Sequence, residues 1–544
     1  MGEKKATCKT LCIMLFLVLA SCVPGIYGAA KQNVSPESTN KASVTVDVQY
    51  IYNITKALSN IVFTSYDEAQ GQIAKGRAFG TVGEHAAAKI LYDNMSMLGL
   101  HPQLEQMQRR PGVPHDDLIT ELEVQNYQVK LNGRALDCFI YPSWKGPHGS
   151  PSEVNTTFSY QGLHVRPIPT HPCVYNRTIA QDSNDFVFLG RDQWNDPNGV
   201  LPVVDLLKPY MNPLKFYIVF HVTSLFNILR ETAFWYLMYP HCKALILQDF
   251  HSDCHDFVFI PKNSDSIPII FITGNDGDQM RADFMGSRVD FNLTQHLNTS
   301  VISYNVIGEI PGRDPTKSVI VSCLYDGWWN QATGDAAIGM AMVLGIAKYF
   351  VQARITPQYT LKFIAFGGEE YDVLGAKYYV ATHKNESIVA LIDLNQLGFT
   401  QNDPRLTLDF VANKALYLKK VWGIVQRTDY QQRTENVTGI KAIWWPSGEI
   451  PGNALPFAQD LHCNAMSIFK DGGWTLHHRD GVNHTAGDVL SYFNWTDTLV
   501  TTEIITNITL AFATGNPDIA ATPLIPLVDG LGFFNEAQKT RLPR

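Results

Sequence analysis

Four carboxylates and one histidine stand where they could act together in chemistry. Asp326 follows an apolar stretch typical of a strand, and Asp335 stands where the next helix should begin. Glu369 and Glu370 follow a second apolar stretch, and His484 lies in "GVNHTAGD". Taken singly, these positions have ordinary explanations, because acids are common at helix N-caps and in first helical turns. Together they are residue types that hold Zn²⁺ and activate a water molecule, the pattern of metal-assisted hydrolysis.

The two glutamates predict two different tasks. Adjacent side chains on a helix point about 100° apart, so Glu369 and Glu370 cannot both do the same job. One can bind a metal ion while its neighbour reaches a water molecule on that ion. The pair therefore predicts one ligand and one general base.

The elements that must position these residues alternate between strand and helix from residue 300 onward. "KSVIVSCLYD" precedes "AAIGMAMVLGIAKYF", "QYTLKFIAFGG" precedes "EEYDVLGAKYYVATH", and "SIVALIDLNQLG" follows. Fully apolar strands alternating with helices predict an α/β fold with a mixed, largely parallel sheet flanked by helices. Ligands bind beyond the carboxyl ends of such strands, where the four acids and Asn395 fall.

The middle of the chain, from about 150 to 300, has a different character. Short apolar runs such as "DFVFLG", "KALILQDF" and "IPIIFIT" are separated by Pro, Asn, Asp and Gly. Before them, "LITELEVQNYQVKLNGRALDCFIY" alternates like a strand pair around Asn132-Gly133, which is a hairpin signal. This pattern predicts a β-rich module inserted into the α/β domain.

Size and charge set the broad class. A chain of 544 residues suits two or three domains, and 45% apolar and 11% aromatic residues supply a large core. The 43 basic residues against 51 acidic ones give a net charge of −8, with no Lys/Arg-rich run. This composition argues against nucleic acid as a partner.

The N-terminus predicts export. Lysines 4, 5 and 9 precede an apolar stretch, residues 11–23, that is shorter than the ~20 residues of a membrane span. Cleavage near Gly28 would remove it as a signal peptide. "LASC" also resembles a lipoprotein box, so a lipid on Cys22 is the alternative, and it is the only membrane attachment we expect. We therefore expect a secreted or extracytoplasmic protein.

Sequons and cysteines agree with an exported glycoprotein. Sequons occur at Asn33, Asn53, Asn94, Asn155, Asn176, Asn292, Asn298, Asn385, Asn436, Asn483, Asn494 and Asn507. Six cysteines follow the leader, an even number that permits disulfides. We expect one between Cys242 and Cys254.

The residues named so far carry a family resemblance. "SVIVSCLYDGWWNQATGDAAIG", "TLKFIAFGGEEYDVLGAKYY", "IDLNQLG" and "VNHTAGD" resemble successive blocks of the aminopeptidase/glutamate-carboxypeptidase family of zinc exopeptidases, whose fold is phosphorylase/hydrolase-like. "GRAFGTVGEHAAAKIL" resembles its N-terminal helix block, and residues 185–310 resemble its protease-associated insert. The resemblance divides the chain into a signal peptide (1–28), a flexible lead-in (29–45), the N-terminal part of the peptidase domain (46–160), the insert (161–305) and the main peptidase part (306–544).

The resemblance assigns roles to four residues. Asp335 matches the carboxylate that bridges two zinc ions, and Glu369 matches the general base. Glu370 and His484 match the remaining ligands of one of the two ions. With a water molecule as the fourth ligand, this set has the ligand count of a catalytic zinc site.

The second metal ion has lost its usual ligands. The family pattern places a His two residues before Asp326 and an Asp three residues before the Gly of "IDLNQLG", where this chain has Leu324 and Asn395. Leu324 cannot bind metal, and Asn395 offers a weak neutral oxygen. Asp326, which orients the missing His, loses that second-shell partner. Asp393 remains an alternative ligand because it lies on the same strand face as Asn395, whereas Cys323 and Tyr325 should point to the opposite face.

Loop residues near the blocks are candidates for the substrate pocket, or else ordinary loop and core side chains: Trp328, Trp329, Trp474, His477 and His478. We expect a one-zinc aminopeptidase acting on peptide N-termini. One alternative is a non-catalytic homologue that serves as a binding or receptor protein. The other is a glutaminyl-cyclase-like acyl transferase with a single zinc, which the insert and Asn395 argue against. The sequence predicts no particular oligomeric state.

Overall fold

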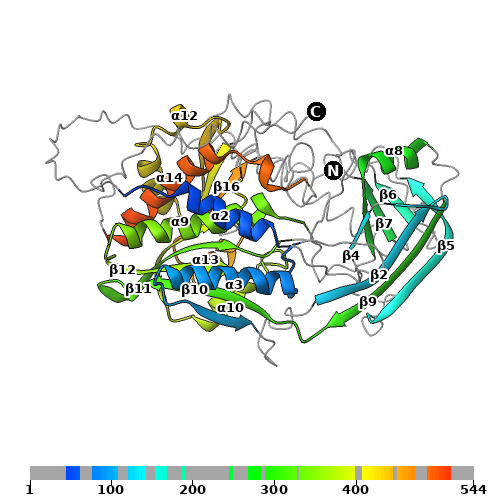
Figure 1. Cartoon of the computed structure of the whole chain (residues 1–544), viewed down its shortest axis with the longest axis horizontal. Helices are drawn as coiled ribbons and strands as arrows, with labels where there is room; N and C mark the ends of the chain where they lie inside the picture. Colours follow the sequence, from blue (N-terminus) through cyan, green and yellow to red (C-terminus); the bar gives the residue numbers. More distant parts are fainter. Residues whose placement is uncertain are drawn as a thin grey trace, which may run out of the picture. The chain divides into compact units, whose positions relative to one another are not determined.

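The computed structural model describes residues 44–61, 76–107, 121–136, 138–141, 154–167, 186–189, 244–248, 268–282, 288–327, 330–398, 407–444, 450–471 and 487–515. The described strands form two eight-stranded sheets (Figure 1). The first sheet comes mostly from residues after 300, and the second comes from residues 121–298.

The first sheet is mixed and largely parallel, as predicted. Its strands lie in the order β1 (Gln103–Met107), β10 (Ser303–Ile310), β12 (Tyr359–Phe366), β11 (Asp314–Leu324), β13 (Ser387–Leu394), β16 (Ala465–Asp471), β14 (Thr407–Ala412) and β15 (Gly439–Trp444). The four central strands β12, β11, β13 and β16 pair in parallel, whereas β1, β10 and β14 make the antiparallel pairings. The carboxyl ends of the central strands therefore meet at one edge.

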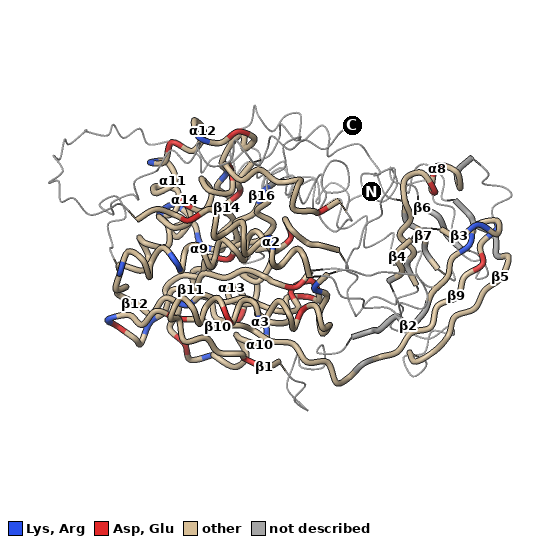
Figure 2. Tube along the Cα trace, viewed as in Figure 1, with Lys and Arg blue, Asp and Glu red and all other residues tan. Residues whose placement is uncertain are grey.

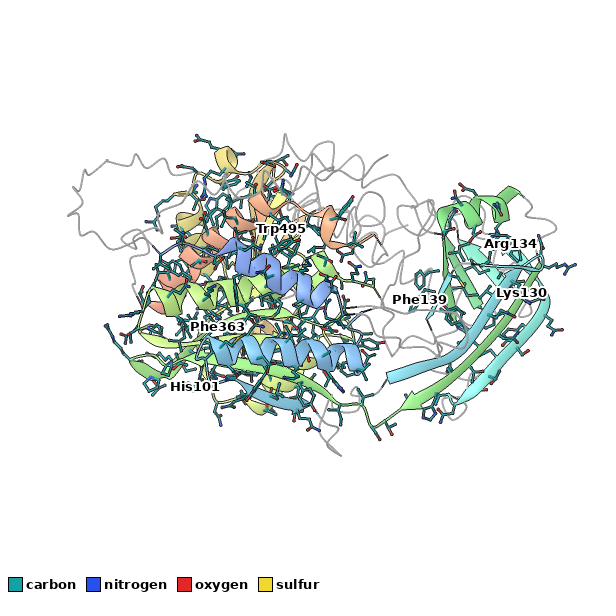
Figure 3. The ribbon with its side chains drawn as sticks, in the orientation of Figure 1. His101, Lys130, Arg134, Phe139, Phe363 and Trp495 are labelled. Carbon is teal, nitrogen blue, oxygen red and sulfur yellow. The ribbon has the colours of Figure 1, made fainter. Side chains whose placement is uncertain are left out.

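Helices cover both faces of this sheet. One hydrophobic core holds the helices α2 (Val48–Ser59), α3 (Val82–Met97), α9 (Ile338–Gln352), α11 (Ala415–Val425) and α14 (Trp495–Ala513). The other core holds α10 (Leu374–Thr382) and α13 (Ala454–Gln459). Trp495, at the start of α14, packs edge-on against Tyr52 of α2, with 4.9 Å between the ring centroids (Figure 3). The predicted fold class is confirmed.

The central strand and the helix after it are apolar because both are buried. Every residue of β11 from Ser318 onward is buried, and so are 12 of the 15 residues of α9. Gly339 lets α9 approach the sheet closely, since a Cβ there would lie 2.8 Å from Cys323 Sγ. Among the described helices, only the stretch Thr333–Gln352 has the length and hydropathy of a membrane span, and 89% of its apolar window is buried inside the domain. Its apolar character is thus that of a core helix.

The second sheet is built around three long strands. Its order is β3 (Arg134–Ala135), β2 (Glu121–Leu131), β9 (Arg288–Asn298), β5 (Thr156–Pro167), β6 (Phe186–Leu189), β7 (Ala244–Gln248), β8 (Ile269–Ile272) and β4 (Cys138–Tyr141), and one described helix, α8 (Gly274–Ala282), contacts β7. The predicted hairpin is present, because Asn132 and Gly133 both have positive φ between β2 and β3. Arg134 pairs with Asp276 of α8 (2.6 Å), and Phe139 stacks on Phe271 (Figure 3).

The boundary of the β-rich module differs from the predicted 161–305. Its first strand, β2, begins at Glu121 and pairs along most of its length with β9, which ends at Asn298. The predicted N-terminal part of the peptidase domain, 46–160, therefore contributes strands to the second sheet. The alternation of β2 signalled a strand but not the distant partner that decides which sheet it joins.

Candidate active site

The carboxyl-end edge of the first sheet gathers five of the predicted residues. Asp326 lies just beyond β11, and Asp335 lies in a short π-helical turn, η6 (Thr333–Ala337), before α9. Glu369 and Glu370 follow β12, and Asn395 follows β13. Parallel pairing aligns the ends of these strands, and Figure 2 shows acidic positions gathered at this edge.

Asp326 fixes the backbone of the two glutamates. Its side chain is fully buried, and its two oxygens accept hydrogen bonds from Glu369 N (3.0 Å) and Glu370 N (3.2 Å). The sequence left Asp326 without a partner, whereas the structure gives it this positioning role. Two charge-neutral N–H donors satisfy the carboxylate, and so hold both glutamates in place.

Asp335 is held from its backbone and from its side chain. Asp488 caps the η6 turn, accepting from Gly334 N (2.7 Å) and Asp335 N (3.2 Å). Asp335 Oδ2 accepts from Gln396 Nε2 at 3.1 Å. The φ and ψ of Asp335 (−118°, 69°) are not helical, so the turn is kinked at the predicted ligand.

Glu369 and Glu370 lie in the turn before α10, which begins at Leu374, and not on that helix as predicted. Glu370 is buried, whereas Glu369 is partly exposed and its Oε1 accepts from Asn395 Nδ2 at 3.2 Å. Gly452 lies beside this contact, because a Cβ there would lie 2.8 Å from Asn395 Nδ2 and 3.5 Å from Glu369 Oε1. The glycine thus leaves room for the hydrogen bond.

Crowding and burial raise the pKa values of the carboxyl groups at this edge. Burial raises the pKa of Glu369 and of Asp326 well above its ordinary value, and the neighbouring carboxylates raise both further. Burial also raises the pKa of Asp488 to about 6 and that of Asp393 to about 7. Carboxylates that oppose one another's ionisation in this way are relieved by a bound cation.

Arg77 is a fully buried cation close to Asp488, Asp326 and Asp335, and the sequence did not reveal it. Its guanidinium donates to four main-chain carbonyls, those of Tyr325 (2.8 Å), Leu58 (3.0 Å), Gln331 (2.9 Å) and Ala332 (2.8 Å). It therefore ties both ends of the segment between Asp326 and Asp335 to the end of α2. Burial lowers its pKa to about 10 against the pull of nearby acids, so it stays charged at neutral pH.

The two halves of the predicted two-metal site differ in how well they fit metal. Asp335 and Glu370 supply the anionic oxygens that a zinc ion needs. At the other half, Leu324 is buried and apolar, and the Asn395 amide donates a hydrogen bond to Glu369. Asp393, the alternative ligand, is fully buried and accepts from Ser322 Oγ at 2.7 Å. No three His, Cys, Asp or Glu side chains in the described ranges are placed to hold an ion by themselves.

Several predicted residues lie outside the described ranges: His484, Trp328, Trp329, Trp474, His477, His478 and the pair Cys242 and Cys254. Among the described cysteines, Cys323 and Cys463 are free. The Cys323 thiol donates to Ala336 O, beside Asp335, and the Tyr325 hydroxyl donates to Tyr304 O. The contacts of Gln396, Arg77 and Gly452 were not predicted, although Arg77 lies in "GRAFG" and Gln396 in "IDLNQLG", two segments that the sequence marked as informative.

The fold and the acidic edge define an α/β domain of the zinc-exopeptidase class. Residues 305–509 match the family model described as Peptidase family M28. This match confirms the resemblance of the sequence blocks that lie within that range.

Relatives and solved structures agree with this assignment. The chain is 36% identical over 174 residues to a probable zinc metalloprotease of Phaeosphaeria nodorum, covering 31% of this chain and 29% of the relative. It is 24% identical over 241 residues to carboxypeptidase Q of Bos taurus, covering 43% and 48%. The chain thus spans less than half the length of each of these relatives.

Two solved structures establish the fold. A peptidase M28 precursor from Shewanella amazonensis SB2B has a TM-score of 0.58 at 14% identity, covering 88% of this chain and 96% of that one. BSAP, a zinc aminopeptidase from Bacillus subtilis, has a TM-score of 0.55 at 16% identity, covering 85% and 94%. At such identities the likeness concerns the fold.

Proposed function

We propose that this chain is a zinc metallopeptidase of the exopeptidase type, most simply a one-zinc aminopeptidase acting on peptide N-termini. The observation that carries the proposal is the set of carboxylates in which the partly exposed Glu369 lies beside the buried Glu370 and Asp335, with Asp326 holding both glutamates. This set combines anionic ligands with a separate, partly exposed carboxylate that can act as a base.

Each residue has a defined part in peptide hydrolysis. Asp335 and Glu370, together with His484, would hold the zinc, which when bound polarises a scissile carbonyl and lowers the pKa of a water molecule. Glu369 takes the proton of the attacking water and returns it to the leaving amine. Asp326 keeps Glu369 in reach by fixing its backbone N–H.

A single zinc agrees with the two unlike halves of the site. Leu324 provides no donor atom, and the Asn395 amide presents an N–H toward Glu369. The aminopeptidase assignment is supported by the likeness in fold to BSAP, a zinc aminopeptidase, whereas the relative carboxypeptidase Q suggests cleavage at peptide C-termini as the alternative. Leu324 and Asn395 also favour a second candidate, a binding or receptor protein that kept the fold without turnover.

We also propose export, with residues 161–305 lying in a protease-associated module. The exposed Asn385 follows α10 and suits a glycan, whereas Asn494 and Asn507 are buried, so their sequons are closed in the folded domain. Intact-mass analysis before and after glycan removal tests this proposal. Protein from a eukaryotic secretory host whose mass does not fall on glycan removal would contradict it.

Metal analysis and a substrate panel test the proposed function. Purified protein should contain about one zinc per chain, and His484→Ala should lose it. Aminoacyl anilides, N-terminal glutaminyl peptides and peptides with free C-termini should be compared, with Glu369→Gln as the matched control.

We expect turnover of the aminoacyl substrates, which Glu369→Gln reduces by about 10²–10⁴-fold at unchanged zinc content. Cleavage at C-termini would make the chain a carboxypeptidase, and cyclisation would make it an acyl transferase. Zinc without turnover of any substrate would favour the binding protein. A chain that binds no zinc would contradict the proposal altogether.

A further inference from the structure

We propose that two consecutive side-chain amides, Asn395 and Gln396, take over the positioning role of a second metal ion. Asn395 holds the base Glu369, and Gln396 holds the ligand Asp335. The inference rests on the proposed function, because it assigns Glu369 and Asp335 those tasks. It concerns two positioning residues for which the family pattern predicts no such pair of donors.

The contacts place one amide on each carboxylate. Asn395 Nδ2 donates to Glu369 Oε1 at 3.2 Å, and Gln396 Nε2 donates to Asp335 Oδ2 at 3.1 Å. A carboxylate bound to metal is held by a cation, whereas here each is held by a neutral N–H dipole.

The backbone explains how neighbouring residues reach the same site. Successive side chains of an extended strand point to opposite faces, so Asn395 and Gln396 should diverge. Gln396 instead has φ +49°, a left-handed conformation that is uncommon outside glycine and asparagine. This turn of the chain just beyond β13 brings both amides to the acidic edge.

The backbone of Asn395 and Gln396 is held in place by β16. Asn395 N donates to Ile468 O at 2.9 Å, and Gln396 O accepts from Lys470 N at 3.3 Å. Both peptide groups are therefore fixed, so the hydrogen bonds to Glu369 and Asp335 exist before any substrate arrives. Gly452, with φ +70°, is a further support, because it leaves the space that the Asn395 amide occupies.

The test separates the two tasks by their readouts. Asn395→Ala should lower kcat by about tenfold or more, with KM and zinc affinity within about twofold, because only the base is misplaced. Gln396→Ala should weaken zinc binding about 10-fold in a chelator competition, the usual effect of losing a partner of a metal ligand. Gln352→Ala, on the exposed end of α9, is the matched amide control and should change neither quantity.

A spectroscopic measurement tests the same inference without any catalytic turnover. The visible spectrum of the Co²⁺-loaded protein should shift in Gln396→Ala and stay unchanged in Asn395→Ala. Leu324→His combined with Asn395→Asp should raise zinc from about one to about two per chain. If either alanine variant does not fold, Asn395→Ser and Gln396→Ser replace it.

Two results would overturn the inference while leaving the proposed function standing. One is an active, zinc-bound wild type whose Asn395→Ala and Gln396→Ala variants keep kcat and zinc affinity within about twofold. The other is a second zinc in Asn395→Asp alone. A wild type with neither zinc nor activity would instead remove the proposed function.

Discussion

The two halves of the candidate site differ in the groups that orient their carboxylates. In one half, Asp335 and Glu370 are buried carboxylates, which we propose as zinc ligands and which a cation would stabilise. In the other half, Leu324 fills space, and Asn395 and Gln396 donate N–H groups to the facing carboxylates. The amides orient the carboxylates without a full positive charge, which only a metal ion in the other half would supply.

The largest effect on stability is expected at Arg77, which supports the half of the site that contains Asp335 and Glu370. Arg77→Met removes a buried cation and leaves four main-chain carbonyls without their donor. We expect a loss of about 3–5 kcal/mol in the free energy of unfolding, measured by urea denaturation. The loss should be greater without zinc, because the nearby acids are then least compensated.

The exposed Arg313 provides the control for this change. Arg313→Met should stay within about 0.5 kcal/mol of wild type. Equal losses in the two variants would show that Arg77 has no special link to the acidic edge.

A smaller effect is expected at Gly452, which supports the half of the site that contains Asn395 and Gln396, called the amide half below. Gly452→Ala places a Cβ 2.8 Å from Asn395 Nδ2 at a φ of +70°. We expect a cost of about 1–3 kcal/mol and a fall in kcat like that of Asn395→Ala. Gly423→Ala is the matched control, because a Cβ there meets nothing within 4 Å, and in the helix α11 it should stabilise by about 0.5–1 kcal/mol.

The smallest expected effect is a pH dependence at Asp393, behind the amide half. Burial raises its pKa to about 7 from an unfolded value near 3.8. The folded state therefore binds the proton more tightly than the unfolded state, so this group costs stability as pH rises from about 4 through 7.

The metal-free protein should accordingly show a higher Tm at pH 6 than at pH 8, by scanning calorimetry. Asp393→Asn should flatten this difference, because an amide does not titrate. An unchanged pH profile in that variant would assign the effect to other acids of the edge, such as Asp488.

The sequence predicted the parts of the site that depend on strand ends. Apolar runs located β11, β12 and β13, so the gathering of Asp326, Asp335, Glu369 and Asn395 at one edge followed from parallel pairing. The direction in which an amide points depends on tertiary contacts and on a single φ angle, so the contacts of Asn395 and Gln396 were not predictable. Arg77 was missed because an isolated arginine in a loop has no periodicity to reveal its burial.

The pairing of β1 with β10 bears on how this architecture arose. The two strands are antiparallel neighbours, with Met107 opposite Ser303 at the end of the ladder. All residues between them, including the whole second sheet, therefore occupy the position of a hairpin loop in the first sheet. A short turn joining β1 to β10 would preserve every strand pairing of the first sheet, so the β-rich module is a natural target for excision or for exchange with another domain.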